Sequence, residues 1–295
     1  MSAKKWTRRD TRSISKDLKE RGVKICPNSV AKLLKEERYS LRLNRKTISE
    51  THHPDRDRQF TIISEEKKRF EDRGQPILSC DTKKKELIGN FKNPGKAWKK
   101  KDQAEQVLTH DFRSDAVAIT SPYGLFETLT NRGTVVVGTS SDTPAFAVDC
   151  LELWLKELGW TTYPSMKELL VLCDSGGSNG YRPRLWKYQL FNEISTRYGI
   201  NIRVCHYPPG TSKWNPVEHR LFSFISMEWA GHPLRSIDLM LNYIRGTTTT
   251  TGLKVTAFTN FNTYQTGIKV SDAKFKQINI QRYKELPAWN YTISP

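Results

Sequence analysis

The chain has 295 residues, of which 48 are Lys or Arg and 31 are Asp or Glu, so its formal net charge is +17. Hydrophobic residues make up 37% of it and aromatic residues 11%, which is enough to build a sizeable core and excludes wholesale disorder. No apolar run approaches the roughly 18 residues of a membrane span, and the charged N-terminus lacks the apolar region of a signal peptide. The five scattered cysteines have no paired C-x-x-C spacing. We therefore expect reduced thiols, no structural zinc and a cytoplasmic protein.

The excess positive charge lies in two stretches. Residues 1–60 hold 17 Lys and Arg against 8 Asp and Glu, and residues 83–101 hold 8 Lys against the single acidic Glu86. The rest of the chain is nearly neutral. Two basic stretches on an otherwise balanced chain favour a polyanionic partner, most economically the phosphates of nucleic acid. Solvated lysine faces are the alternative interpretation.

Residues 11–37 have the pattern of two short helices around a tight turn. Ser13 is expected to cap the first helix, Gly22 to end it, and Pro27 to begin the second. This pattern is typical of a helix-turn-helix, although any helical hairpin shares it. The second helix would direct four polar or basic side chains toward DNA: Asn28, Ser29, Lys32 and Lys35. Residues 42–58 have the composition of a basic linker or wing.

The later part of the chain alternates between strand and helix patterns. A charged connecting helix is predicted over residues 61–72, and further helices over residues 147–158, 184–198 and 216–229. Strands are predicted at residues 77–82, 116–120, 134–139, 169–173 and 200–205, with residues 86–91 returning antiparallel to the first of them. The threonine run at residues 247–251 is expected to be a loop or strand, because β-branched side chains disfavour a helix. This order indicates an α/β fold.

Three acidic residues lie where this fold would bring them together. Asp81 ends the first strand, Asp174 directly follows the strand at residues 169–173, and Glu218 lies in the first turn of a helix. Functional groups gather at the carboxyl ends of strands in α/β sheets, so the two aspartates can face one site. Three clustered carboxylates repel one another unless a hard cation lies between them, and Mg²⁺ or Mn²⁺ prefers oxygen ligands. Two such ions could support phosphodiester displacement.

Each of these carboxylates also has a purely structural interpretation. Asp81 and Asp174 could be ordinary turn residues after strands. Asn215, Pro216 and Glu218 fit the N-cap, N1 and N3 positions of a capping box, in which Glu218 would cap its own helix. The capping and catalytic roles of Glu218 need not exclude each other.

Several long blocks of the sequence carry a family likeness. They are SCDTKKKELIGNFKNPGKAW, LLVLCDSGGSNGYRPRLWK, VCHYPPGTSKWNPVEHRLFSFIS, TTTTTGLKV and WNYTI, with HPDRDRQF before the first strand. They resemble the DDE transposases of bacterial insertion sequences in the Rhodopirellula-type group, over residues 11–293. WNPVE is also similar to the Asn-Pro-x-Glu signature of the mariner-like superfamily.

The resemblance implies an RNase H-like catalytic domain at residues 59–295, with a mixed five-stranded sheet flanked by helices. Asp81, Asp174 and Glu218 match the family's metal-binding acidic triad. The implied enzyme cuts insertion-element ends and joins their 3′-hydroxyls to target DNA by hydrolysis and transesterification, with two Mg²⁺ or Mn²⁺ ions as cofactors. Its partner would be DNA rather than a membrane, and it would act as a homodimer or higher oligomer at the bacterial nucleoid.

The remaining residues 1–58 would form the helix-turn-helix-like DNA-binding region and its linker. Members of the group usually carry a longer N-terminal region, so the resemblance predicts a truncated copy. The alternative functions are a non-catalytic DNA-binding remnant or regulator, and a general RNase H-like nuclease without strand transfer. Lys83, Lys84 and Lys85 directly follow Asp81 and are expected to contact the DNA backbone near the scissile phosphate.

Overall fold

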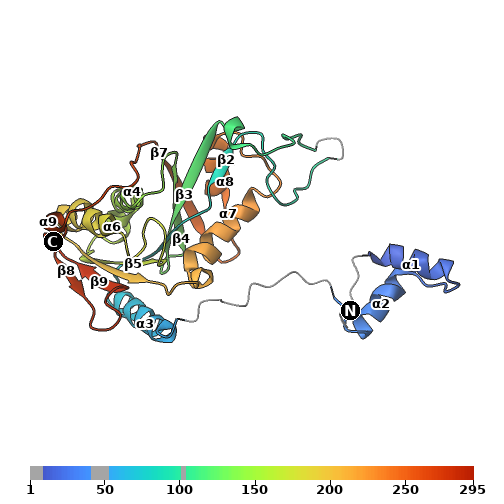
Figure 1. The fold of residues 1–295 in the computed structure, drawn as a ribbon, viewed down its shortest axis with the longest axis horizontal. Coiled ribbons are helices and arrows are strands. Elements are labelled where there is room, and N and C mark those ends of the chain that lie inside the picture. The colour runs from blue at the N-terminus through green and yellow to red at the C-terminus, as the bar shows by residue number, and fades with distance from the viewer. Residues whose placement is uncertain (1–8, 41–52, 101–103) are drawn as a thin grey trace. The chain divides into compact units, whose positions relative to one another are not determined.

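The computed structural model describes residues 9–40, 53–100 and 104–295 (Figure 1). The chain forms two compact units, residues 1–49 and residues 50–295. Within the described ranges, no helix has the length and apolar character needed to span a bilayer.

In the first unit, two helices pack against each other: α1 (Thr11–Glu20) and α2 (Pro27–Glu36). α1 is capped by Asp10 rather than by Ser13, because the Asp10 carboxylate accepts a hydrogen bond from the Ser13 N–H at 2.7 Å. The chain turns after α1 at Gly22, whose φ of +86° is the left-handed conformation that favours glycine. The two predicted helices are therefore present. Residues 9–40 contain no third helix of the kind a helix-turn-helix unit normally includes.

The second unit is built on one mixed sheet flanked by helices (Figure 1). Its strands are β1 (Ile77–Thr82), β2 (Glu86–Ile88), β3 (Ala118–Glu127), β4 (Arg132–Gly138), β5 (Glu168–Cys173), β6 (Asn201–His206), β7 (Lys254–Asn260), β8 (Ile280–Arg282) and β9 (Asn290–Ile293). The order is β7-β4-β3-β1-β5-β6-β9-β8, and β2 pairs with β3 off this path. β1, β5 and β6 run parallel, whereas β3 is antiparallel to both β1 and β4. The predicted α/β class with a mixed sheet is confirmed.

Helices cover both faces of this sheet. The helices of this unit are α3 (Arg56–Asp72), α4 (Pro144–Trp154), α5 (Trp160–Thr162), α6 (Arg184–Gln189), α7 (Ser223–Glu228), α8 (Ile237–Gly246) and α9 (Asp272–Phe275). Wider π-helical turns adjoin several of them: η2 (Leu155–Gly159), η3 (Leu190–Thr196) and η5 (Glu218–Phe222). Short 3₁₀ turns lie at η1 (Arg113–Asp115) and η4 (Ser212–Trp214).

The alternation of side chains along the strands decides which helices cover which face. In β5, Val171 belongs to the core beneath α4 and α6, whereas its neighbours Leu170 and Leu172 belong to the core beneath α3. In β4, Val135 and Val137 face a third cluster, formed with η5, α7 and α8. Because successive strand residues point to opposite faces, a strand buried on both sides is a continuous hydrophobic run.

Three predictions about the sheet and its helices need correction. The described residues form nine strands rather than five, since β7 extends one edge, β9 and β8 extend the other, and β2 pairs with β3 off this path. Residues 86–91 do not return beside the first strand; β2 pairs with β3 instead, with Glu86 opposite Thr120. The predicted connecting helix is longer, and its Ile62, Ile63 and Phe70 are buried in the core. The two errors about strands share one cause, because β2, β7 and β9 each pair with a strand that lies far away in the sequence.

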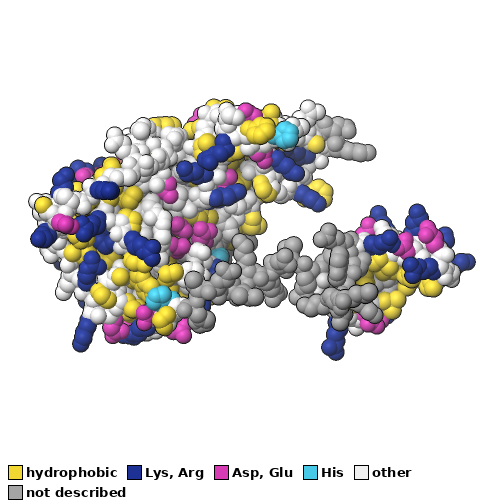
Figure 2. All heavy atoms as spheres, in the orientation of Figure 1, with side chains coloured by type: hydrophobic (Ala, Val, Ile, Leu, Met, Phe, Trp, Pro, Cys, Tyr) yellow, Lys and Arg dark blue, Asp and Glu magenta, His cyan; other side chains and the backbone are white. Residues whose placement is uncertain are grey.

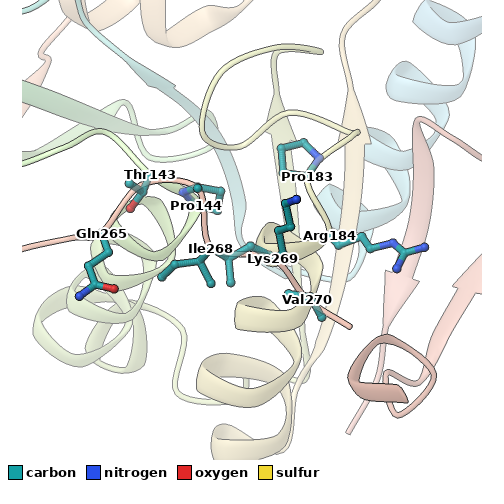
Figure 3. A pocket seen from close by; sticks show the side chains of 10 residues that line it. Thr143, Pro144, Pro183, Arg184, Gln265, Ile268, Lys269 and Val270 are labelled. Carbon is teal, nitrogen blue, oxygen red and sulfur yellow. The ribbon is translucent and has the colours of Figure 1, made fainter. Parts of the chain in front are cut away.

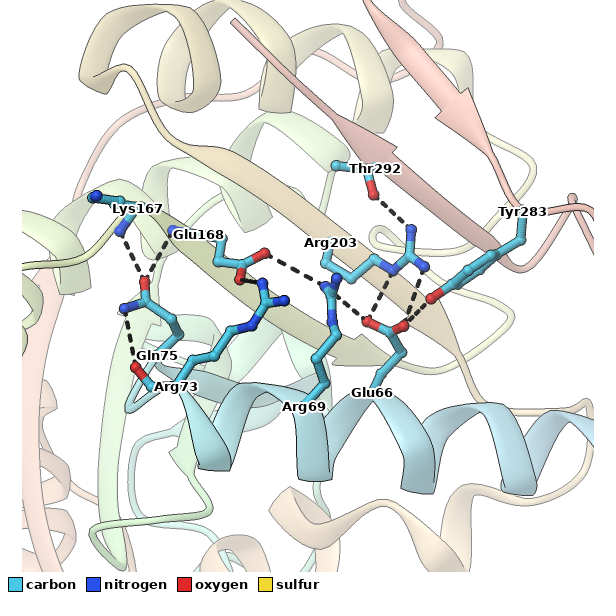
Figure 4. A network of polar contacts seen from close by, with 9 residues as sticks. All are labelled: Glu66, Arg69, Arg73, Gln75, Lys167, Glu168, Arg203, Tyr283 and Thr292. Carbon is cyan, nitrogen blue, oxygen red and sulfur yellow. Dashed lines mark hydrogen bonds and ion pairs between the residues drawn. The ribbon is translucent and has the colours of Figure 1, made fainter.

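A buried polar network ties α3 to the C-terminal strands (Figure 4). Glu66 of α3 pairs with Arg203 of β6 at 3.2 Å, and each side chain is 8% exposed. The Tyr283 hydroxyl donates to the same carboxylate, and the Arg203 guanidinium donates to the Thr292 hydroxyl at 2.6 Å. The edge of the sheet is thus joined to α3 by charged groups as well as by apolar packing.

Candidate active site

Asp81 and Asp174 lie at the same end of two neighbouring parallel strands. β1 and β5 pair in parallel with Cys80 opposite Cys173. Asp81 directly follows Cys80, and Asp174 directly follows Cys173. Both aspartates are half-buried. The carboxyl ends of parallel strands are where functional side chains gather in α/β sheets. The structure therefore brings these two predicted residues together.

Glu218 reaches the same end of the sheet because Asn215 fixes the start of its helix. The buried Asn215 side chain accepts a hydrogen bond from the Ser79 hydroxyl and donates one to the Asp174 carboxylate at 3.0 Å. The Val217 N–H donates to the same Ser79 hydroxyl at 3.0 Å. These bonds hold the beginning of η5 against β1. Glu218, the first residue of η5, is carried to the two aspartates.

The Asn215 side-chain oxygen hydrogen-bonds to a strand of the sheet rather than to the first turn of the helix. A capping box would need its oxygen to accept a hydrogen bond from a backbone N–H of that turn, whereas this oxygen accepts from Ser79. The charge of Glu218, in turn, contributes to the raised pKa of Asp81. The capping interpretation of these two residues therefore competes with contacts that link the helix to the strands.

A glycine of β3 allows η5 to approach Asp81 closely. Gly124 stands opposite Asp81 in the antiparallel pairing of β1 with β3. A Cβ atom at this position would lie 2.5 Å from the Phe222 ring and 2.9 Å from Val217. Any larger residue would push the helix that carries Glu218 away from the sheet.

The electrostatics of the site follow from burial and from the proximity of like charges. Burial raises the pKa of Asp81 to about 8, and the charges of Asp174 and Glu218 add to this rise while a hydrogen bond from the Thr82 N–H opposes it. Burial also raises the pKa of Asp174, which the bond from Asn215 opposes and the charge of Glu218 reinforces. A set of carboxylates that destabilise one another's charge is suited to a cation.

The donor set fits a hard divalent metal. All three side chains offer carboxylate oxygens, the ligands that Mg²⁺ and Mn²⁺ prefer, and their mutual repulsion is what a bound cation would relieve. Among the residues that the structure describes, no three His, Cys, Asp or Glu side chains are already arranged around a common metal position. The three carboxylates would have to draw closer together around an ion.

A buried histidine supports the Asp174 backbone and was not singled out as a site residue in the sequence. His206 of β6 places Nδ1 3.0 Å from the Asp174 carbonyl oxygen and Nε2 3.0 Å from the Tyr291 hydroxyl. Burial lowers the pKa of His206 to about 3, so the ring is neutral. One tautomer satisfies both contacts, with Nδ1–H donating to the carbonyl and the hydroxyl donating to Nε2. No local pattern reveals this role, because Tyr291 belongs to a distant strand.

The three lysines after Asp81 differ sharply in their surroundings. Lys83 is 7% exposed and pairs with Glu86, while its ammonium lies 4.9 Å from the centre of the Trp229 ring. Burial lowers its pKa, and Glu86 opposes that shift. Lys84 and Lys85 are exposed. Of the three, only the latter two present their ammonium groups to solvent.

The four side chains predicted to read DNA belong to the first unit. Asn28, Ser29, Lys32 and Lys35 are all exposed on α2. The Ser29 N–H also bonds to Cys26 Sγ at 3.4 Å, at the start of the helix. Their placement is compatible with contact to an external partner, and their role in DNA binding stays a prediction.

Two hollows lie beside the carboxylates. Figure 2 shows Asp and Glu side chains gathered in the middle of the second unit on the face in view, with Lys and Arg on the surfaces around them. One hollow, of about 510 Å³, is lined by Asp174, by residues 175–177 and 180–183 of the loop that follows it, and by residues 208–210 and 212. The other, of about 370 Å³, is lined by Glu218 together with Lys83 and Lys84. Both offer space for a substrate at the acidic centre.

A third hollow, of about 470 Å³, lies elsewhere in the second unit. It is bounded by the start of α4, the start of α6 and a segment of residues 265–270 (Figure 3). Its walls are mainly apolar, with Pro144, Pro183 and Ile268 among them. The three carboxylates do not line it, so we assign it no part in the chemistry.

Comparison with known proteins points to one family. A family model described as the Rhodopirellula transposase DDE domain matches residues 1–295. No curated protein matched this chain. Among solved structures, the Mos1 transposase paired-end complex with the left transposon end is 13% identical and has a TM-score of 0.48. The Mos1 mariner paired-end complexes with Mn (12%, 0.45) and with Mg (13%, 0.47) are also similar. In all three cases 80% of this chain aligns, and it spans 65% of the Mos1 chain.

Proposed function

Because this chain belongs to the Rhodopirellula transposase DDE domain family, we propose that it is a DNA transposase that cuts element ends and joins their 3′-hydroxyls to target DNA. The observation that carries this proposal is the arrangement around Asp81, Asp174 and Glu218. Two carboxylates follow paired residues of parallel strands, and the third is brought to them by the Asn215 contacts. Such a site is suited to phosphodiester chemistry with a divalent metal.

In this proposal Asp81, Asp174 and Glu218 hold two Mg²⁺ or Mn²⁺ ions. When bound, the ions would supply Lewis acidity to the attacking oxygen and to the leaving oxygen of the scissile phosphodiester. Asn215 orients the Asp174 carboxylate, and neutral His206 holds the backbone of the same residue. The exposed Lys84 and Lys85 contact DNA phosphates beside the hollow that Glu218 lines.

Residues 1–58 would add sequence-dependent contacts to the element ends. Their exposed Asn28, Ser29, Lys32 and Lys35 offer the hydrogen-bonding and basic groups that such contacts need. Two ends must be held together for joining, which favours a homodimer or higher oligomer on DNA.

The test uses oligonucleotides that carry the terminal inverted repeats flanking the gene. We expect strand cleavage and joining that need Mg²⁺ or Mn²⁺ and fall at least about 10³-fold in Asp81→Asn, Asp174→Asn and Glu218→Gln. Glu157→Gln, at an exposed position of η2, is the matched control and should retain full activity. DNA binding should persist in all four variants.

Each alternative function predicts a different result in the same assay. A DNA-binding remnant would bind the ends without cutting them under any metal condition. A general nuclease would cut without joining. Full activity in Asp81→Asn and Asp174→Asn would refute the assignment of the carboxylates.

A further inference from the structure

The segment of residues 92–100, between β2 and β3, presents a tryptophan entirely to solvent. Trp98 has an exposed fraction of 104%, the highest among the large exposed hydrophobic residues of the described chain. Burying a large aromatic side chain is favourable by about 3 kcal/mol. A fully exposed indole therefore forgoes a substantial stabilisation unless a partner covers it.

This exposure is not a consequence of a detached loop, because the segment is anchored immediately before Trp98. The Gly231 N–H donates to the Pro94 carbonyl at 3.0 Å, and the Asn93 amide donates to the His232 carbonyl at 2.9 Å. A Cβ at Gly95 would lie 2.6 Å from the Cβ of Ala230, so the two backbones are in close contact. The indole thus projects from a fixed support.

The surroundings of Trp98 are basic. Lys92, Lys96 and Lys100 are exposed, whereas Lys99 pairs with Glu105. Lys92, Lys96 and Lys99 also line a hollow of about 410 Å³ beside the anchored backbone. An exposed aromatic ring among lysines is the combination with which proteins bind unpaired nucleic-acid bases, since the ring stacks on a base while the ammonium groups contact the phosphates.

The helix that anchors this segment is the one that begins at the acidic site. Glu218 is the first residue of η5, which continues into α7, and Ala230 lies just beyond its end. At 1.5 Å per residue, the two positions are about 18 Å apart along the axis. Successive nucleotides of one strand are spaced by about 3.4 Å along a DNA helix. A strand that follows this helix from the carboxylates would reach the anchored Gly95 after about five nucleotides, and Trp98 follows Gly95 by three residues.

We propose that Trp98 stacks on an unpaired base of the DNA strand held at the acidic site, several nucleotides from the scissile phosphate, while Lys96 and Lys100 contact its backbone. The proposal rests on the DNA transposase function proposed above. It adds a substrate feature to that function, namely a preference for DNA that is unpaired next to the cleavage point. Positive charge around the ring favours a nucleic acid over a second copy of this basic chain as the partner that covers it.

The experiment compares two fluorescein-labelled DNAs, a 30-base-pair duplex and the same duplex with a single-stranded tail, by anisotropy in EDTA. We expect the wild-type chain to bind the tailed duplex more tightly, and Trp98→Ala to weaken that complex about 5- to 150-fold, the range that corresponds to stacking on one base. Trp98→Phe should retain part of the preference because it keeps an aromatic ring. The affinity for the paired duplex should be unchanged by either substitution.

Matched variants and a second readout separate stacking from other effects. Phe261→Ala, at an aromatic residue that is 66% exposed, should leave both affinities unchanged. Lys96→Ala and Lys100→Ala should weaken both complexes and lower their salt dependence, whereas Lys167→Ala, at another exposed lysine, should not. A 2-aminopurine scanned along the tail should lose fluorescence at one position on binding to the wild type, but at none on binding to Trp98→Ala.

The possible outcomes distinguish a failure of the Trp98 stacking proposal from a failure of the proposed transposase function. A wild-type chain that cuts element ends but binds both DNAs equally overturns the stacking proposal alone, and so does Trp98→Ala with an unchanged preference. If Trp98→Ala instead converts an oligomer to a monomer in sedimentation with the preference intact, the ring is a contact between protein chains. A wild-type chain that neither binds nor cuts DNA refutes both proposals.

Discussion

Asn215 and Asp174 are joined by a hydrogen bond of 3.0 Å between the side-chain Nδ2 of the first and Oδ1 of the second. The same amide accepts a hydrogen bond from Ser79, so one buried side chain connects the loop after β5 to β1. This bond stabilises the charged form of Asp174 against the effect of burial, which raises its pKa. Asn215 is therefore placed to orient the Asp174 carboxylate.

Replacing Asn215 by Ala should impair both stability and catalysis. The Ser79 hydroxyl and the Asp174 carboxylate would lose a buried partner, which costs about 1–3 kcal/mol in the free energy of unfolding. The Asp174 carboxylate would also lose its orientation, so we expect cleavage to fall about 10- to 100-fold. Urea unfolding and cleavage rates on the same preparation measure the two effects.

Asn279→Ala provides the control for this prediction. Asn279 is exposed and donates its side-chain hydrogen bond to the Pro295 carbonyl. Its replacement should leave the cleavage rate unchanged. Wild-type cleavage by a folded Asn215→Ala variant would show that the amide does not position Asp174.

The lysines after Asp81 should separate into two classes. Lys84→Ala and Lys85→Ala should each weaken DNA binding and reduce the slope of log K against log salt by about 0.9, because each exposed ammonium would neutralise one phosphate. Lys83→Ala should instead lower the free energy of unfolding by about 3 kcal/mol, since it removes the buried partner of Glu86. Binding titrations from about 50 to about 200 mM salt, together with urea unfolding, test this division. An unchanged salt slope in the Lys84→Ala, Lys85→Ala double variant would contradict the contact.

Replacing one member of the buried ion pair between Glu66 and Arg203 should lower the free energy of unfolding. Arg203→Ala leaves a carboxylate that is 8% exposed without its partner on β6 but still paired with Arg69 at 3.0 Å, and we expect a loss of about 3 kcal/mol in the free energy of unfolding. Replacing both residues by Met should cost less than the sum of the single changes. The exposed pair of Arg58 with Glu285 is the control, and Arg58→Ala should change the free energy of unfolding far less than Arg203→Ala. A double-mutant cycle by urea unfolding gives the coupling directly.

Lys187 should make stability depend on pH above neutrality. Burial lowers its pKa from 10.5 to about 8 in the folded chain. Between pH 8 and 10.5 the unfolded chain therefore binds a proton that the folded chain does not, so stability rises with pH across this window. The free energy of unfolding of the wild type minus that of Lys187→Met should increase by up to about 3 kcal/mol from pH 8 to 10.5. A difference that stays flat over this window would show that the folded-state pKa of Lys187 is ordinary.

The local sequence was a good guide to elements whose signals are themselves local. The apolar run ending at Cys173 predicted β5, and Pro27 and Pro144 mark the first residues of α2 and α4. β7 and β9 were not predicted as strands, because each is stabilised by pairing with a distant segment: β7 with β4, and β9 with β6. β7 lies at one edge of the sheet and β9 next to the other edge, which β8 forms.

At the candidate site, too, the features that depend on local sequence were predicted, and those that depend on distant contacts were not. The strand-end positions of Asp81 and Asp174 were readable from the sequence, as was the charge of the lysines that follow. The role of Gly124 was not, since it depends on the approach of Phe222 from a helix almost a hundred positions later. The support that His206 gives to Asp174 likewise depends on the pairing of three strands.

The sequence by itself determined the α/β pattern and the excess of positive charge in two stretches, and it singled out three acidic residues as candidates, because caps, alternation and charge are properties of neighbouring residues. Only the tertiary structure decided that Asn215 connects Asp174 to β1, that Lys83 is buried against Glu86 and that Trp98 projects from an anchored support. These features depend on which distant segments pack together. Packing is governed by burial and hydrogen bonding summed over the whole chain, and no short stretch of sequence contains that sum.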